Sequence, residues 1–196
     1  MNRHASLTRT TAETEISVAL QLEGSGQHDI STGIGFFDHM LTLLAVHGLF
    51  DLRLKARGDL QVDAHHTVED TGIALGTAFL EALGNRQGLH RLAVSYVPLD
   101  EALARTVVDA SGRGYLHFEA SFNSAQAGDF PSELVEDFLR AFALNAKMTL
   151  HVTLLAGRNT HHQIEVIFKS LGRALRQAVA LDPRQPGIPS SKGVLV

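Results

Sequence analysis

Apolar side chains recur along the chain with two periods, one of two residues and one near 3.6 residues. The first is typical of half-buried strands and the second of amphipathic helices. The pattern predicts strands over residues 13–23, 27–32, 49–57, 93–98, 102–110, 114–120 and 147–156, and helices over residues 36–47, 65–83, 131–146 and 161–181. Prolines at 183, 186 and 189 predict an irregular tail. The mixture of strands and helices predicts an α/β chain of the α+β kind.

Two of the predicted helices resemble each other residue by residue. Aligned at an offset of 96 residues, His65–Leu83 and His161–Val179 share seven of 19 positions. The shared positions are His65/His161, His66/His162, Glu69/Glu165, Leu75/Leu171, Gly76/Gly172, Ala78/Ala174 and Ala82/Ala178. Helix propensity does not require the histidines or the glutamate. We therefore interpret the chain as an internal duplication with halves at 1–92 and 93–196, which form one compact functional unit.

A repeated turn supports the duplication. A Gly-x-Gly turn follows a strand-like run in each half, at Gly24–Gly26 and at Gly112–Gly114. Each half is then expected to hold a ladder of strands and two helices.

Composition narrows the class of protein. Of 196 residues, 44% are apolar and 19% are charged, which favours a packed core over disorder. Cysteine is absent, which excludes disulfides, thiolate metal sites and cysteine nucleophiles. The longest stretch without Asp, Glu, Lys or Arg is 12 residues, His39–Phe50, whereas a membrane span needs about 18. No apolar signal segment follows Met1, so we expect a soluble, cytoplasmic protein.

Charge and aromatic content argue against nucleic-acid binding. The formal net charge is −4, no basic run is present, and the chain has no tryptophan and two tyrosines. Histidine is abundant instead: the chain has 11, and four of them form the two His-His pairs. Since histidine is the commonest metal ligand, the pairs are the first functional lead.

The spacing of the paired histidines predicts metal binding. Residues four apart lie on one face of a helix, so His65 and Glu69 can hold one metal ion together. His66 is rotated by about 100° and must serve another site. One predicted metal site therefore combines His65 and Glu69 with a third ligand, His162, from the neighbouring copy. The other predicted site combines His161, Glu165 and His66. Imidazole and carboxylate without thiolate suit Mn, Fe, Co or Zn, and open mixed sites favour Mn or Fe.

His39 is a further candidate ligand. It lies in the apolar segment Gly35–Leu41 at a predicted helix start, where a buried structural histidine is the alternative interpretation.

Several cations are candidates for holding an anionic substrate. Arg91, Arg113, Lys169 and Lys192 are the candidates, the last in a Pro-Ser-Ser-Lys-Gly segment that adds the hydroxyls of Ser190 and Ser191. The alternative is that they are turn residues or a solvated tail. Lys169 is the most informative because it follows His161 by eight residues, about two turns along the same helix face.

Taken together, these segments resemble the imidazoleglycerol-phosphate dehydratase family of histidine biosynthesis. The matching segments are Arg9–Thr14, Gly35–Leu41, Asp63–Asp70, Asp109–Arg113, His161–Lys169 and Pro189–Gly193. The resemblance implies two halves like domain 2 of ribosomal protein S5, each a mostly antiparallel sheet packed on helices. It also implies two Mn(II) ions per active site, and self-association into trimers and an octahedral 24-mer with active sites between subunits.

The resemblance also implies a role for each site residue. The implied metal ligands are His39, His65, His66, Glu69, His161, His162 and Glu165, of which His65, Glu69, His161 and Glu165 are counted with the catalytic set. Glu13 is expected to contact substrate and act as the acid and base. The implied substrate contacts, chiefly to phosphate, are Arg91, Arg113, Lys169, Ser190, Ser191 and Lys192. One departure is Asp137, which stands where many members have a further ligand histidine, so that site either gains an oxygen ligand or loses one ligand.

The implied reaction converts D-erythro-imidazoleglycerol phosphate, a small phosphorylated imidazole, to imidazoleacetol phosphate and water. Two alternatives remain from the residues alone: a dinuclear-metal hydrolase of phosphate esters, and a metal-binding shell protein without catalysis. The anion-binding set argues against the shell, because storage of metal does not require it.

Overall fold

The structure is a computed structural model that describes residues 3–195. Its strands are β1 (His4–Thr10), β2 (Thr14–Gln21), β3 (His28–Ser31), β4 (Asp51–Gly58), β5 (Leu92–Leu99), β6 (Ala102–Asp109), β7 (Tyr115–Glu119), β8 (Gln126–Ala127), β9 (Phe130–Pro131) and β10 (Thr149–Ala156). Its helices are α1 (Gly35–Gly48), α2 (His65–Leu83), α3 (Leu134–Ala146) and α4 (Thr160–Val179).

The two halves share one topology. The first sheet has the order β1-β2-β4-β3 and the second the order β5-β6-β10-β7. In each sheet the first three strands pair antiparallel, and the last strand pairs parallel to its neighbour. In each half, one helix precedes the strand that comes last along the chain and the other follows it: α1 and α2 flank β4, and α3 and α4 flank β10. The predicted fold class, a duplicated α/β fold with mostly antiparallel sheets packed on helices, is confirmed.

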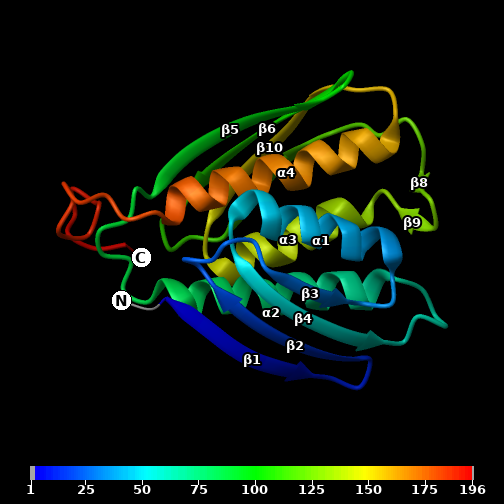
Figure 1. The fold of residues 1–196 in the computed structure, drawn as a ribbon, viewed down its shortest axis with the longest axis horizontal. Helices are drawn as coiled ribbons and strands as arrows, with labels where there is room; N and C mark the ends of the chain where they lie inside the picture. The colour runs from blue at the N-terminus through cyan, green and yellow to red at the C-terminus, as the bar shows by residue number, and fades with distance from the viewer. Residues whose placement is uncertain (1–2, 196) are drawn as a thin grey trace.

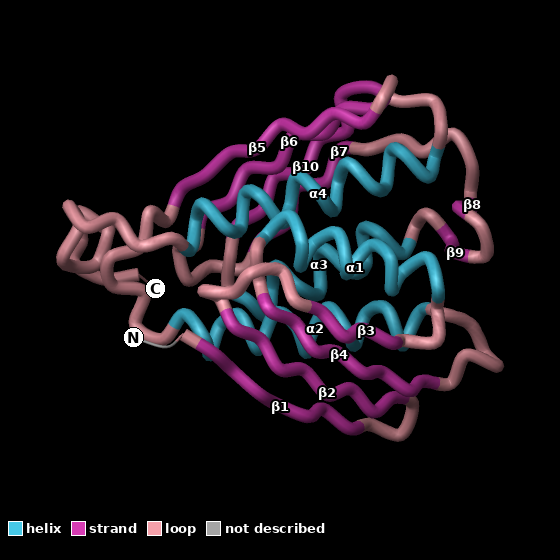
Figure 2. Tube along the Cα trace, in the orientation of Figure 1, coloured by secondary structure: helices cyan, strands magenta, loops and turns pink. Residues whose placement is uncertain are grey.

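The helices lie in a layer between the two sheets (Figures 1 and 2). Helix α2 packs on β1 and β2, and α4 packs on β5 and β6. The halves are joined by two helix pairs, α2 with α3 and α1 with α4. Alternation along the strands supports this arrangement: in β2, Ile16, Val18 and Leu20 are buried while Glu15 and Ser17 are exposed. The core is therefore common to both halves.

Two glycines of the repeated helix explain how closely the helix pairs approach. A Cβ on Gly76 would lie 2.6 Å from the carbonyl oxygen of Phe142 in α3. A Cβ on Gly172 would lie 2.6 Å from the carbonyl oxygen of Leu44 in α1. Glycine is thus required where the backbones of two helices meet, which accounts for its appearance at the same position in both copies.

The structure differs from the predicted elements in three places. Strand His4–Thr10 was not predicted, because Ala5 is its only fully buried side chain and its apolar signal is correspondingly weak. Helix α3 begins at Leu134 rather than at residue 131, since Pro131 belongs to the short β8–β9 hairpin, which was also not predicted. Within residues 3–195, no helix is both long enough and apolar enough to cross a membrane.

Candidate metal centre and active site

Helices α1 and α4 bring together three potential metal ligands. One ligand atom each from His39, His161 and Glu165 lies within 4.8 Å of the other two. Glu165 Oε2 is 3.1 Å from His161 Nε2 and 3.6 Å from His39 Nε2. The side chain of Asn159 caps α4 by accepting the backbone N–H of His161, which places the histidine in the first turn. We call this group the α1–α4 cluster.

The α1–α4 cluster is open on one side. The side chains of His39 and His161 are 45% and 48% exposed, whereas that of Glu165 is 12% exposed. Burial raises the pKa of Glu165, but the hydrogen bond and charge of Lys169, together with His39 and His161, outweigh it and lower the pKa. Glu165 is therefore a carboxylate. Lys169, which the sequence analysis expects to contact phosphate, forms an ion pair with Glu165 in this structure. The exposed rings leave room for a ligand from outside the chain.

A related group forms between α2 and α3. His65 lies 3.8 Å from Glu69 through Nε2 and 3.6 Å from Asp137 through Nδ1. We call these three residues the α2–α3 cluster. It is looser than the α1–α4 cluster, because the two carboxylates approach opposite nitrogens of the ring. Asp137 occupies the position that His39 has in the other half, and its carboxylate lies beside His65 in this structure.

The chemistry of these donors fits a divalent metal such as Mn or Fe. Both clusters combine imidazole nitrogen with carboxylate oxygen, and neither contains sulfur. Such mixed sites with open positions suit these ions.

The second histidine of each pair faces away from its own cluster. His66 Nδ1 lies 3.0 Å from Asp59 Oδ2, and His162 Nδ1 lies 2.9 Å from Glu101 Oε2. The hydrogen bond to Asp59 raises the pKa of His66, and that to Glu101 raises the pKa of His162. The rotation of about 100° expected between neighbouring helix positions is therefore present.

Glu13 lies in the turn between β1 and β2, near His66. Its Oε1 is 3.8 Å from His66 Nε2, and its side chain is 53% exposed. The hydroxyl of Thr11 accepts the backbone N–H of Glu13 and shapes the turn. Glu13 is thus an accessible carboxylate beside a candidate ligand.

The predicted phosphate contacts are mostly far from the metal ligands within one chain. The backbone N–H of Arg91 donates to the carbonyl oxygen of Ala178, near the end of α4. His161 is at the other end of that helix, about 25 Å away for 17 residues at 1.5 Å each. The Arg91 guanidinium donates to Asp109 and to the carbonyl oxygen of Pro189, which ties it to the tail. We call Arg91, Arg113 and residues 190–192 the anion end.

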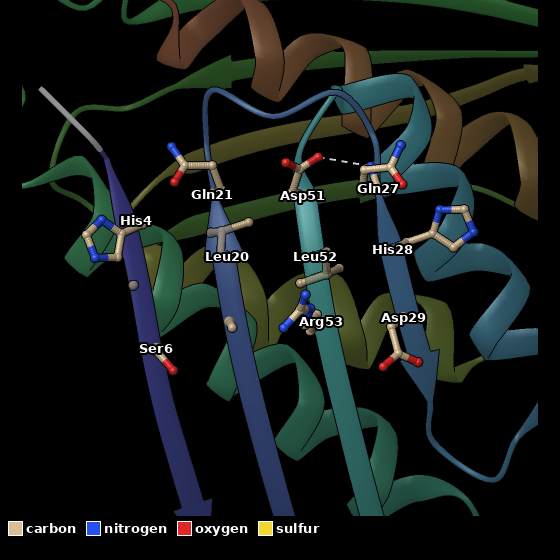
Figure 3. A pocket seen from close by; sticks show the side chains of 12 residues that line it. His4, Ser6, Leu20, Gln21, Gln27, His28, Asp29, Asp51, Leu52 and Arg53 are labelled. Atoms are coloured by element: carbon tan, nitrogen blue, oxygen red, sulfur yellow. Dashed lines mark hydrogen bonds between the residues drawn. The ribbon is translucent and has the colours of Figure 1, made fainter.

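The first half has a corresponding end, but a carboxylate occupies its loop. Asp51 Oδ1 accepts the backbone N–H groups of Ser25 and Gln27 at 2.8 and 2.9 Å, and the contact with Gln27 is drawn in Figure 3. Asp51 pairs with Gln21 in the sheet, as Thr149 pairs with Asp109 in the second half. Thr149 offers no carboxylate, and its hydroxyl donates to the carbonyl oxygen of Arg113. In the second loop the equivalent backbone N–H groups, those of Arg113 and Tyr115, donate to Ser111 Oγ and to the carbonyl oxygen of Met148, so no carboxylate is needed there.

Sequence reasoning missed two residues that contact the paired histidines, Asp59 and Glu101. Glu101 had a signal, because it follows Glu13 by 88 residues, the same offset that relates Gly24–Gly26 to Gly112–Gly114. Asp59 had none, because the corresponding position in the second half is Gly157.

Comparison with known proteins decides the family. A sequence model of imidazoleglycerol-phosphate dehydratase matches residues 32–175. The chain belongs to the imidazoleglycerol-phosphate dehydratase family. An imidazoleglycerol-phosphate dehydratase from Caldanaerobacter subterraneus is 57% identical over 193 residues, which is 98% of this chain and 100% of that protein. One from Gluconacetobacter diazotrophicus is 56% identical over 194 residues, 98% of each chain.

Solved structures of the family share the fold. The Staphylococcus aureus imidazoleglycerol-phosphate dehydratase is 41% identical with a TM-score of 0.83, covering 91% of this chain and 99% of that one. The Pyrococcus furiosus enzyme, in complex with (S)-C348, is 35% identical with a TM-score of 0.84, covering 96% and 100%. Membership of the family makes this chain an enzyme, a dehydratase of histidine biosynthesis and thus a lyase.

Proposed function

We propose that the chain removes water from D-erythro-imidazoleglycerol phosphate to form imidazoleacetol phosphate, in active sites that two or more copies of the chain build together. The observation that carries the proposal is the pair of duplicated His/carboxylate clusters, each open on one side. An imidazole ring has two nitrogens, so two metal sites related by the duplication match the substrate's own ring.

The residues of this chain would hold two Mn(II) ions, with Fe, Co or Zn as possible substitutes. His39, His161 and Glu165 would hold one, and His65, Glu69 and Asp137 the other, with His66 and His162 of a neighbouring copy completing the two sites. When bound, the ions would act as Lewis acids that stabilise negative charge on the imidazole ring.

Glu13 is the residue that we assign to proton transfer. The C2 hydrogen of the substrate has no adjacent carbonyl to acidify it. The C2 proton and the hydroxyl on the carbon next to the ring must both depart, which forms water and an enol, and the enol becomes the ketone of the product. An accessible carboxylate within reach of the candidate ligand His66 suits the transfer of that proton.

The anion end would bind the phosphate from another copy of the chain. A phosphorylated six-carbon substrate extends only about 10 Å at ~1.5 Å per bond. It cannot span the roughly 25 Å between His161 and Arg91 along α4 of one chain. The substrate would then be oriented by Arg113, Lys169 and the Ser190–Lys192 turn, so that the binding energy of the phosphate holds the reacting carbons in place.

The outer face of the second sheet supports self-association. It exposes large apolar side chains at Leu92, Val94, Tyr96, Val107 and Tyr115. The equivalent face of the first sheet presents polar side chains. A contiguous exposed apolar face is typical of an interaction surface, and the trimers and octahedral 24-mer expected from the family resemblance would cover such faces.

Replacement of Glu13 by Gln tests the proposal. Mn(II) content and substrate binding should stay near wild type, and turnover of imidazoleglycerol phosphate should fall by about 10²-fold or more. Formation of the ketone and release of inorganic phosphate are measured in parallel on the wild-type enzyme. Unchanged turnover in the variant would remove Glu13 from this role, and release of inorganic phosphate without ketone from the metal-loaded wild type would contradict the proposed reaction.

A further inference from the structure

The duplication places a glutamate in the same turn of each half, with different surroundings. Glu13 joins β1 to β2, and Glu101 joins β5 to β6, 88 residues later. The side chain of Glu13 is 53% exposed, while that of Glu101 is 26% exposed. Glu101 Oε1 accepts the backbone N–H groups of Arg158 and Asn159 at 3.0 and 2.8 Å, and its Oε2 lies 2.9 Å from His162 Nδ1. Both carboxylate oxygens of Glu101 therefore already have hydrogen-bond partners within the chain.

The contact with Glu101 determines which nitrogen of His162 is available. An ionised carboxylate only accepts hydrogen bonds, so the proton of the neutral ring must be on Nδ1. The lone pair is then on Nε2, on the far side of the ring from Glu101. A neutral imidazole nitrogen with a free lone pair is what a metal ion needs.

The first half achieves the same result with a different residue. His66 Nδ1 lies 3.0 Å from Oδ2 of Asp59, which directly follows β4. In the second half, the residue directly after β10 is Gly157, which has no side chain to offer. The turn glutamate therefore replaces Asp59 in the second half, and Glu13 in the first half is left beside Nε2 of His66 instead.

We propose that Glu101 is a positioning residue that holds His162 with Nε2 directed out of the chain for a metal ion. Asp59 does the same for His66. The two glutamates of the duplicated turn, Glu13 and Glu101, have thereby taken different roles. This inference rests on the proposed metal centre. Glu101 orients a ligand, whereas Glu13 remains available to the substrate. The division also explains why only one of two glutamates at equivalent positions serves as the acid and base.

The substitution Glu101→Gln tests this with minimal change to the fold. The amide oxygen can still accept the N–H groups of Arg158 and Asn159, which preserves the turn. The amide nitrogen takes the place of Oε2 and donates to His162 Nδ1, so the ring proton moves to Nε2 and blocks it. Outer carboxylate partners of ligand histidines are typically worth 10–100-fold in metal affinity. We expect the Kd for Mn(II) to rise by about that factor, measured by titration of the metal-free full-length protein with Mn(II) alone and detection of free ion by electron paramagnetic resonance.

Glu13→Gln is the matched control, because it is the same substitution at the duplicated position. It should bind Mn(II) with the wild-type Kd and lose turnover. If Glu101→Gln binds Mn(II) as tightly as wild type, the positioning role is wrong while the proposed function stands. If the wild type binds no Mn(II), the proposed metal centre and this inference both fail.

Asp59→Asn and a folding measurement separate positioning from a structural role. The thermal unfolding of metal-free Glu101→Gln should match that of the wild type. If it unfolds early and its folded fraction binds Mn(II) normally, Glu101 is a turn residue and the inference is overturned. The Asp59 carboxylate is hydrogen-bonded to His66, so Asp59→Asn should weaken Mn(II) binding by a similar factor. Wild-type affinity in that variant would likewise overturn the inference.

Discussion

The contact between α1 and α4 should not tolerate a methyl group at Gly172. A Cβ there would lie 2.6 Å from the carbonyl oxygen of Leu44 and 3.0 Å from the backbone nitrogen of Gly48. Both atoms are backbone, so the helices must separate. Overpacking of this kind costs about 1–3 kcal/mol, and the higher helix propensity of alanine offsets up to ~1 kcal/mol of it. We expect Gly172→Ala to lower the free energy of unfolding by about 1–2 kcal/mol.

The assay is thermal unfolding of the metal-free protein, followed by circular dichroism at one fixed protein concentration. For a chain of this size, 1–2 kcal/mol corresponds to a Tm decrease of about 2–8 °C. Gly35→Ala is the matched control, because it also lies in a helix and nothing lies within 4 Å of the position that its new methyl group would take. Its Tm should be unchanged or slightly raised. If Gly172→Ala unfolds at or above the temperature of Gly35→Ala, the close approach of the two helices is not what requires glycine.

Three further outcomes are expected. The backbone N–H of Ser25 lowers the pKa of Asp51 against an opposing effect of burial, and that of Gln27 adds to the lowering. A lowered folded pKa stabilises above the unfolded value near ~3.9 and loses that effect as the pH falls through the folded pKa, so Asp51→Asn should cost about 1 kcal/mol in urea unfolding at pH 7 and progressively less as the pH falls below ~3.9. Arg91→Met removes the ion pair with Asp109 and frees the tail, so KM should rise about tenfold with kcat little changed in steady-state assays. Chelation of metal should abolish activity and reduce the assembly size in size-exclusion chromatography, and added Mn(II) should restore both.

The parts of the site that lie within one helix could be predicted from the sequence. His65 with Glu69, and His161 with Glu165, are four residues apart, and helical geometry alone places each pair on one face. His39 needed the resemblance to the family as well, because its partners come from another helix. The pairing of α1 with α4 decides which histidine meets which glutamate, and that pairing depends on the packing of both halves.

Residues contributed by loops could not be predicted in the same way. Asp59 and Glu101 reach the paired histidines only because the strands before them end beside the first turns of α2 and α4. No local pattern around residue 59 shows this, and residue 101 carries only its 88-residue offset from Glu13. Strand His4–Thr10 was missed for a related reason: it is an edge strand with little buried apolar surface, and its partner β2 stabilises it more than its own pattern does.

The two halves have diverged more at the strand starts than at the helix starts, and the difference has a physical cause. At the helix starts, both halves keep a histidine and a glutamate four residues apart, since each is expected to supply a metal site. At the strand starts, Asp51 satisfies the loop N–H groups of the first half from within the chain. The second half has Thr149 there, and the equivalent N–H groups, those of Arg113 and Tyr115, donate to Ser111 Oγ and to the carbonyl oxygen of Met148, so this loop is satisfied without a carboxylate. Under the proposed function, the two helix starts would supply two metal sites for the two nitrogens of the ring, whereas a substrate with one phosphate would need the cation of only one loop, that of Arg113.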